Sequence, residues 1–120
     1  MAFIIHLPTF EDSRGKLTII EKALPFEIKR VYYIYNATAK RGGHRHKKNV
    51  QALICLKGGC EIFVNDGKKK ETFYLDSPDK CLIVETKDWH TMDKFKDDAI
   101  LLVLASEYYD VTDYIDEEYP

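Results

Sequence analysis

Two histidines in the segment RGGHRHKK, His44 and His46, are the residues of this sequence best suited to chemistry. In a β-strand the side chains of residues i and i+2 lie on one face, so both imidazoles are expected to point the same way. Imidazoles titrate near neutral pH, which suits them to proton transfer, and they are also common metal ligands. The spacing by itself also fits an exposed strand edge on which histidines alternate with Arg45 and Lys47.

The residues that follow place the histidine pair in a larger pattern. Gln51 and Gly58 complete the spacing H-x-H-x4-Q-x6-G. This spacing resembles the first motif of the cupin superfamily, in which two histidines and a glutamate point into a small barrel and commonly bind a divalent metal. A third cupin histidine is expected after a proline-containing turn, and His90 follows the Ser77-Pro78 turn. The resemblance implies an all-β cupin jelly roll, a double-stranded β-helix barrel.

The residue in the position of the metal-binding glutamate is Gln51, which carries no charge. A divalent cation bound there would have imidazoles and an amide oxygen as ligands, without an anion to offset its charge. Three histidines alone hold zinc in some catalytic sites, so a zinc site stays the alternative. We predict a site with no metal and no other cofactor, in which the histidines act as acid and base on a weakly acidic C–H bond.

The elements that must position these residues are short strands separated by turns, a pattern typical of a β-sandwich or barrel. Turns are expected at Gly58-Gly59 and at 96–98, and Asn65-Asp66-Gly67 predicts a hairpin. The ten expected strands cover residues 3–7, 16–21, 28–36, 44–48, 51–57, 60–66, 68–75, 81–85, 89–95 and 99–106.

The C-terminal segment YYDVTDYIDEEYP predicts a short helical turn. Asp110 or Thr112 is the expected N-cap, and a turn this short needs to dock on the sheet or on a partner subunit. The chain shows no internal repeat, low-complexity tract or linker. We therefore expect a single cupin domain over residues 1–120.

Composition limits the partners and the compartment. A net charge of -2 and an isoelectric point near 6.1, without a basic face, argue against nucleic acid as a partner. No apolar run approaches the length of a membrane span and the first residues lack a basic leader, so we expect a cytoplasmic protein that does not enter a membrane. Cys55, Cys60 and Cys81 lie in or beside apolar stretches and are expected to be reduced and buried.

Seven motifs in one order give a more specific resemblance that spans nearly the whole chain: DSRGKL (12–17), IKRVYYI (28–34), RGGHRHKK, QALICLKGGCEI, LDSP, DWHTM and VLASEYYDVTDYI. Together they resemble the bacterial nucleotide-sugar 3,4-ketoisomerases. The resemblance implies an isomerase that converts dTDP-4-keto-6-deoxy-D-glucose to a 3-keto-6-deoxyhexose through an enediol. Such enzymes need no metal and serve the biosynthesis of 3-amino and 3-acetamido sugars of surface polysaccharides, such as O-antigen, and of S-layer glycans.

The resemblance also assigns roles to individual residues. His46 is the expected base, and His44 is expected to assist proton transfer or to polarise an oxygen. Surface charge stays the alternative for the arginines, and core packing stays the alternative for the aromatic side chains and the third histidine. The expected substrate contacts are Arg14 and Arg41 for the pyrophosphate or the enediolate, Gln51, Tyr33 and His90 near the sugar, and Trp89 on the thymine base.

Two other functions stay open at this point. The dTDP-sugar 3,5-epimerases are also metal-free cupins with a D-x-R-G segment; they are longer, and their catalytic histidine is paired with an aspartate and works against a tyrosine acid. A non-catalytic nucleotide-sugar-binding cupin is the other alternative. The N-terminal segment FIIHL has a strand edge that needs a partner, and the family is dimeric, so we expect a homodimer, with exchange of N-terminal strands as one way to form it.

Overall fold

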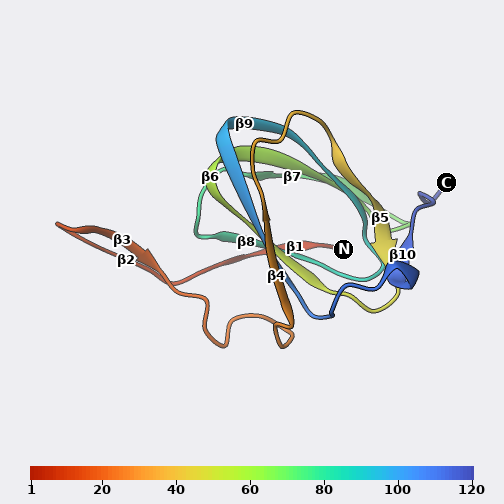
Figure 1. The fold of residues 1–120 in the computed structure, drawn as a ribbon, viewed down its shortest axis with the longest axis horizontal. Coiled ribbons are helices and arrows are strands. Elements are labelled where there is room, and N and C mark those ends of the chain that lie inside the picture. The colour runs from red at the N-terminus through yellow and green to blue at the C-terminus, as the bar shows by residue number, and fades with distance from the viewer.

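The computed structural model describes all residues from Met1 to Pro120. The chain folds almost entirely into strands, as Figure 1 shows, so the all-β prediction is confirmed. The elements in chain order are β1 (Phe3–His6), β2 (Thr9–Asp12), β3 (Gly15–Thr18), β4 (Arg30–Ile34), β5 (Arg41–His46), β6 (Gln51–Asn65), β7 (Lys70–Leu75), β8 (Lys80–Val84), β9 (Trp89–Ala105), the 3-10 helix η1 (Val111–Asp113) and β10 (Tyr114–Ile115).

The two longest strands, β6 and β9, form the spine of the sheet. They pair antiparallel from Gln51 opposite Ala105 to Asn65 opposite Trp89. On the side of β6, the sheet continues through β8 to β1 at one end and through β7 at the other. On the side of β9, it continues through β4 at one end and through β5 to β10 at the other. The sheet curls, so these strands surround a common interior (Figure 1).

Two of the predicted turns are wrong. Strand β6 continues through Gly58-Gly59, and β9 continues through 96–98, with three register shifts between Cys55 and Glu61. The backbone has positive φ at Gly58 (67°) and at Asp97 (56°), a conformation that kinks both strands at the same place. These residues therefore bend the spine instead of reversing the chain, as β-bulges do.

The hairpin predicted at Asn65-Asp66-Gly67 is confirmed. Strands β6 and β7 pair on both sides of it, from Cys60 opposite Leu75 to Asn65 opposite Lys70. The Asp66 side chain accepts hydrogen bonds from the backbone N–H groups of Lys68 and Lys69, which fixes the turn.

The N-terminal region has two parts that differ in their partners. Strand β1 pairs with β8 of its own chain, which satisfies one edge of the FIIHL segment. Strands β2 and β3 pair only with each other and extend away from the rest of the molecule (Figure 1). The part of the N-terminal region without a partner in the chain is therefore this hairpin, and exchange of β1 stays a prediction.

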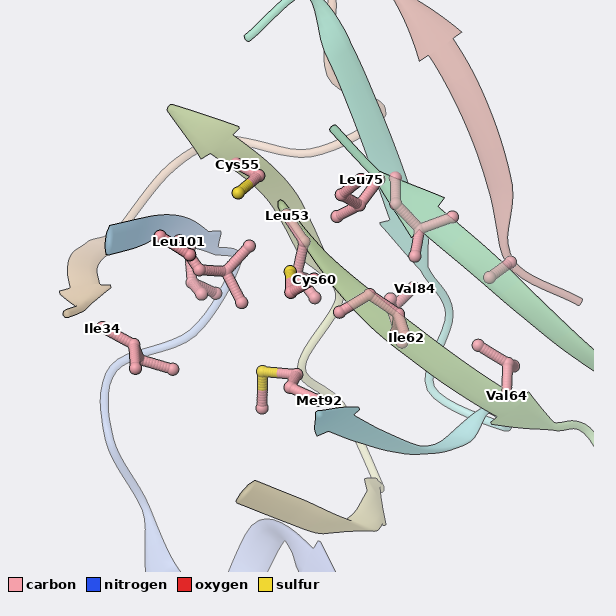
Figure 2. Close-up of a cluster of buried hydrophobic side chains, with 14 residues drawn as sticks. Ile34, Leu53, Cys55, Cys60, Ile62, Val64, Leu75, Val84, Met92 and Leu101 are labelled. Atoms are coloured by element: carbon pink, nitrogen blue, oxygen red, sulfur yellow. The ribbon is translucent and has the colours of Figure 1, made fainter. Parts of the chain in front are cut away.

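The interior of the curled sheet is the main core. Fourteen buried side chains from the walls of the barrel pack there, among them Leu53, Ile62 and Leu101 (Figure 2). A second group of six buried residues lies on the outer side of β6 and β8, where Leu24 and Phe26 of the loop before β4 cover it. The three cysteines are buried and none forms a disulfide, as expected.

The C-terminal segment closes the end of the barrel next to β5. Asp110 caps η1 by accepting a hydrogen bond from the backbone N–H of Thr112, so the predicted helical turn and its cap are confirmed. The two residues of β10 then pair with His46 and Arg45, which docks the segment on the sheet. The structure has no helix with the length and apolar character needed to cross a membrane.

Candidate active site

His44 and His46 lie on β5 with their rings on the same side of the strand, 5.1 Å apart between ring centroids. The glycines before them let β5 lie close to β9: at Gly42, φ is 85° and a Cβ atom would come within 2.9 Å of the carbonyl oxygen of His90. A residue with a side chain would force the strands apart. The predicted pairing of the two imidazoles on one face is therefore confirmed, and Gly42 helps to set their depth.

The third histidine completes a cluster of three rings. His90 lies opposite His44 in the β5–β9 register, and its ring centroid is 5.4 Å from that of His44 and 6.2 Å from that of His46. Its Nδ1 donates a hydrogen bond of 3.0 Å to the carbonyl oxygen of Asp88, which leaves Nε2 without the ring proton. The sequence correctly places His90 with the other two histidines.

An aspartate that the sequence analysis missed holds His46. The Nδ1 atom of His46 lies 2.9 Å from Oδ2 of Asp113, in the 3-10 helix, and both residues are buried. Backbone N–H groups of Lys48 and Asn49 also donate to this carboxylate. The bond to a carboxylate fixes the proton on Nδ1, so Nε2, which is buried and has no partner, carries a free lone pair, as a general base requires.

Tyr114, the residue after Asp113, packs against both catalytic candidates. Its ring centroid lies 4.6 Å from that of His44 and 4.7 Å from that of His46. The pairing of β10 with β5 places it there, because Tyr114 stands directly opposite His46. The C-terminal segment thus contributes two residues, an acid–base partner and an aromatic wall, to the histidine cluster.

Burial determines the charge state of the histidines. It lowers the pKa of His44 and of His90 to about 4, helped by the charge of neighbouring histidines. Burial also lowers the pKa of His46 below its usual 6.5, although the hydrogen bond and the charge of Asp113 act in the opposite direction. All three imidazoles are therefore neutral at neutral pH, the form in which His46 accepts a proton.

Gln51 and Tyr32 form a polar pair on another wall of the interior. The Nε2 of Gln51, on β6, donates a hydrogen bond of 3.1 Å to the hydroxyl of Tyr32, on β4. The Arg30 guanidinium lies over the Tyr32 ring, 4.5 Å from its centroid. Burial raises the pKa of Tyr32. Gln51 stands opposite Val84, two residues before Thr86, whose carbonyl oxygen accepts a hydrogen bond from the backbone N–H of His46. The pair therefore belongs to the same part of the barrel as the histidines.

The residues as arranged do not fit a metal ion. No three His, Cys, Asp or Glu side chains converge as ligands. Gln51, in the position of the metal-binding glutamate, is neutral and would give a bound cation no anionic ligand to offset its charge. Proton transfer by the side chains themselves is the chemistry that this arrangement supports.

The structure places the two predicted arginines differently. Arg41 is the first residue of β5, three positions before His44, and it is exposed. Arg14 lies at the tip of the β2–β3 hairpin, paired with Asp12 and 88% exposed. In Figure 1 this tip and β5 are at opposite ends of the molecule, so Arg14 does not reach the histidines of its own chain.

The expectation that Tyr33 lines the barrel is wrong, whereas the contact of Trp89 with the thymine base stays a prediction. Tyr33 is 62% exposed on the outer face of β4, where its ring packs near Tyr35. Trp89 faces outward from β9, packs edge-on against Phe63 and donates from Nε1 to the carbonyl oxygen of Asp116. In both strands the alternation of side chains puts the neighbouring residue, Tyr32 or His90, on the inner face.

Three residues of the site had weak signals in the sequence. Tyr32 belongs to a run of aromatic residues in which either alternate set could face inward, and buried Ile34 shows which set does. Asp113 and Tyr114 are far from β5 in sequence, and only the docking of the C-terminal segment brings them to His46. Acidic and aromatic residues in a terminal tail do not by themselves indicate a site.

A curled all-β barrel with a buried His–Asp pair and no converged metal ligands defines an acid–base site on a cupin-type scaffold. The model of one protein family, described as "FdtA: WxcM-like, C-terminal", matches residues 2–119. The chain belongs to this family.

Two relatives are similar over nearly the whole chain. It is 47% identical over 116 residues to TDP-4-oxo-6-deoxy-alpha-D-glucose-3,4-oxoisomerase of Aneurinibacillus thermoaerophilus, with 93% of this chain and 84% of that protein covered. A solved structure of the 3,4-ketoisomerase QdtA from Thermoanaerobacterium thermosaccharolyticum, a histidine-to-asparagine mutant in complex with TDP-4-keto-6-deoxyglucose, is 40% identical with a TM-score of 0.92. That match covers 97% of this chain and 87% of the other.

The epimerase alternative has weaker support. The solved dTDP-4-dehydrorhamnose 3,5-epimerase of Bacillus anthracis matches with a TM-score of 0.82 at 19% identity, over 94% of this chain and 76% of that one, and this shows a shared fold alone. A histidine paired with an aspartate was expected to mark the epimerases, yet His46 has this partner here, with Tyr114 beside it. The pairing therefore does not separate the two activities.

Proposed function

We propose that the chain is a sugar-nucleotide 3,4-ketoisomerase that converts dTDP-4-keto-6-deoxy-D-glucose to the 3-keto isomer. The observation that carries this proposal is the buried Nε2 of His46, left without a partner while Asp113 holds Nδ1. A base fixed in this way is suited to removing a carbon-bound proton. The names of the similar enzymes support the nucleotide and the sugar.

The reaction moves two protons between neighbouring positions of the sugar. The C4 carbonyl acidifies the hydrogen on C3, so His46 Nε2 removes that proton while the carbonyl electron pair moves to O4. The resulting enediolate exchanges the proton of O3 for one on O4, and His44, whose ring is 5.1 Å from that of His46, is placed to carry it. His46 then returns its proton to C4 as the C3 carbonyl forms.

The remaining contacts recognise the nucleotide sugar. Arg41 is the candidate for the pyrophosphate within the chain, because a guanidinium binds phosphate with two parallel hydrogen bonds. His90 is fully enclosed beside the other rings, so its role is to support His44 and to shape the sugar pocket. The product is a 3-keto sugar of the kind that amination at C3 would consume, in a cytoplasmic route to surface glycans.

The hairpin of β2 and β3 supports a homodimer. Phe10 and Leu17 are opposite each other in the hairpin and are 61% and 63% exposed, an apolar surface with no partner in the chain. Arg14 at the tip extends beyond the body of the molecule. We propose that the hairpin packs on a second copy and brings Arg14 to the substrate bound there.

The experiment that tests the activity is incubation with dTDP-4-keto-6-deoxy-D-glucose and identification of the 3-keto product by NMR. His46→Asn should abolish turnover and leave the affinity for dTDP within about twofold of wild type, while His44→Asn should only slow the reaction. Full activity in both variants would remove the histidines from the mechanism.

Metal independence is tested with the same assay. Because the donor groups do not converge on a metal, activity should survive exhaustive dialysis against a chelator. Loss of activity that zinc or iron then restores would contradict this part of the proposal.

A further inference from the structure

The turn between β8 and β9, residues 85–88, holds two of the three histidines through its backbone. The carbonyl oxygen of Thr86 accepts a hydrogen bond of 3.1 Å from the backbone N–H of His46. The carbonyl oxygen of Asp88 accepts one of 3.0 Å from Nδ1 of His90. The β8–β9 turn therefore fixes the main chain of the proposed base on β5 and the ring orientation of the third histidine on β9.

The β8–β9 turn is also tied to the C-terminal segment. The carbonyl oxygen of Lys87, in the middle of the turn, accepts a hydrogen bond of 2.8 Å from the hydroxyl of Tyr119. The same segment carries Asp113, the partner of His46. Three consecutive carbonyl groups of one turn thus join β5, β9 and the segment that supplies the carboxylate of the site.

The side chain of Asp88 closes this turn. Its Oδ2 accepts a hydrogen bond of 2.9 Å from the backbone N–H of Glu85, and its own backbone N–H donates to the Glu85 carbonyl oxygen at 3.0 Å. Asp88 is completely buried and its Oδ1 accepts no hydrogen bond, although the amino group of Met1 lies 3.7 Å away. A buried carboxylate oxygen without a hydrogen bond is unfavourable for folding, so its presence indicates a use beyond stability.

The hydrogen bond from His90 to the turn determines the tautomer of that ring. A carbonyl oxygen only accepts, so Nδ1 carries the proton and Nε2 has the free lone pair. His90 is 1% exposed, and its ring lies edge-on to that of His44 with the centroids 5.4 Å apart. Because close-packed interiors transmit displacements, a change in the orientation of His90 moves His44, which carries a proton between the sugar oxygens in the proposed reaction.

We infer that Asp88 is a positioning residue of the active site: by closing the β8–β9 turn, it holds His90 in the tautomer protonated on Nδ1 and keeps the main chain of His46 in place. The inference rests on the proposed ketoisomerase activity, and Asp88 acts through the two histidines and not on the substrate. Without its carboxylate, the backbone N–H of Glu85 loses its acceptor and the turn is free to open. The carbonyl of residue 88 then moves relative to His90, and both ring nitrogens compete for the proton.

The first test is Asp88→Ala, with Asp66→Ala as the matched control. Asp66 closes the β6–β7 turn in the same way, by accepting from backbone N–H groups, and it too lies near the Met1 amino group, at 3.6 Å. Its turn bonds to no histidine. Displacement of the histidines should lower kcat of Asp88→Ala by about 10- to 100-fold, with KM changed by less than about threefold, and the control should keep kcat within about twofold of wild type. An equally active Asp88→Ala variant would overturn the inference.

The second test determines the tautomer of His90 by NMR of the imidazole nitrogens in protein labelled at histidine. Burial lowers the pKa of His90 to about 4, so the ring is neutral at neutral pH and its two nitrogen shifts show which one carries the proton. The wild type should have a single tautomer, protonated on Nδ1, and Asp88→Ala a mixture of both. Protonation on Nε2 in the wild type, or the wild-type tautomer kept unchanged in Asp88→Ala, would overturn the inference.

Asp88→Asn separates positioning from a general loss of stability. Asparagine has the same shape and keeps an oxygen for the backbone N–H of Glu85, so the variant should keep the single His90 tautomer and a kcat within about threefold of wild type. A kcat as low as that of Asp88→Ala with the tautomer unchanged would mean that the carboxylate does not act through the turn, and would overturn the inference. Wild-type protein that does not isomerise the keto sugar removes the proposed activity, while the NMR result still decides whether Asp88 fixes His90.

Discussion

At the scale of single residues, the proposed chemistry depends on how one imidazole is oriented. His46 has two ring nitrogens, and Asp113 binds one of them, so the other keeps a free lone pair in a defined tautomer. The two residues are 67 positions apart, and the carboxylate is itself held by two backbone N–H groups. Asp113 is thus a positioning residue whose removal should affect the rate more than substrate binding.

Asp113→Asn should lower kcat by about 10²- to 10⁴-fold, because an amide at this position no longer selects the tautomer with a free Nε2 lone pair. The affinity for dTDP should change little. Asp97→Asn is the control, since Asp97 is exposed on the bend of β9 with a positive φ that asparagine tolerates. An Asp113→Asn variant with wild-type kcat would show that His46 needs no partner.

The pH profile tests the same pair. Burial lowers the pKa of His46 below 6.5, and the base works only when it is neutral, so kcat/KM should stay level as the pH falls through 6.5 and decline at lower pH. The carboxylate of Asp113 raises this pKa, so its removal should move the acid limb to still lower pH while reducing the rate. An acid limb at or above pH 6.5 in the wild type would contradict the burial of the base.

The sequence predicts that the three histidines lie together because their spacing belongs to a known motif, and the structure brings their rings together. It misidentifies Tyr33 because a strand of alternating aromatic residues has two possible inner faces, and the choice depends on packing around Ile34. It misses Asp113 because the contact with His46 forms only after the whole sheet is built and the C-terminal segment docks. Local spacing shows which residues can do chemistry, whereas long-range pairing decides which of them meet.

At the scale of elements, the bend in the β6–β9 spine gives the barrel its curvature. The sequence correctly predicts strands on both sides of Gly58-Gly59 but wrongly predicts that the chain reverses direction there. A pair of glycines is compatible with a turn and with a β-bulge, so it does not distinguish them. What decides is the partner strand: β9 has its own kink opposite the glycines, so the two strands bend as one. The glycines alone do not show that β6 pairs with β9 from Gln51 to Asn65.

Gly58→Ala should destabilise the protein by about 2 kcal/mol or more, measured by urea unfolding. The residue has a φ of 67°, and a Cβ atom there would collide with the carbonyl oxygen of Lys96 and lie 2.7 Å from that of Asp97. Gly59→Ala is the control, because its nearest contact is the end of the flexible Lys96 side chain at 3.0 Å, and it should cost less than about 1 kcal/mol. Equal losses would show that the bend does not need glycine.

At the scale of the whole molecule, the hairpin of β2 and β3 is the feature that one chain leaves unexplained. It extends from the body with Phe10 and Leu17 exposed and Arg14 at its tip (Figure 1). An apolar projecting arm is stable in water when a second subunit covers it. If the β2–β3 hairpin reaches the active site of the second subunit, each active site contains residues from two chains.

Mixing two inactive variants tests this arrangement. Arg14→Ala and His46→Asn should each have little activity, and a mixture with exchanged subunits should recover about one quarter of wild-type activity, because half of the dimers then have one intact site. A mixture of His44→Asn and His46→Asn is the control and should show no activity beyond the sum of the two variants alone. Activity no higher than the sum of the two variants, or a monomer in light scattering, would contradict the shared site.

The most direct measurement is deuterium exchange at C3 of dTDP-4-keto-6-deoxy-D-glucose in D₂O, followed by NMR. We expect the wild-type protein to replace the C3 hydrogen and to form the 3-keto isomer, and we expect His46→Asn to bind dTDP but to do neither. Absence of C3 exchange with the wild type, or unchanged exchange with His46→Asn, would contradict the claim that His46 is the base of a sugar 3,4-ketoisomerase.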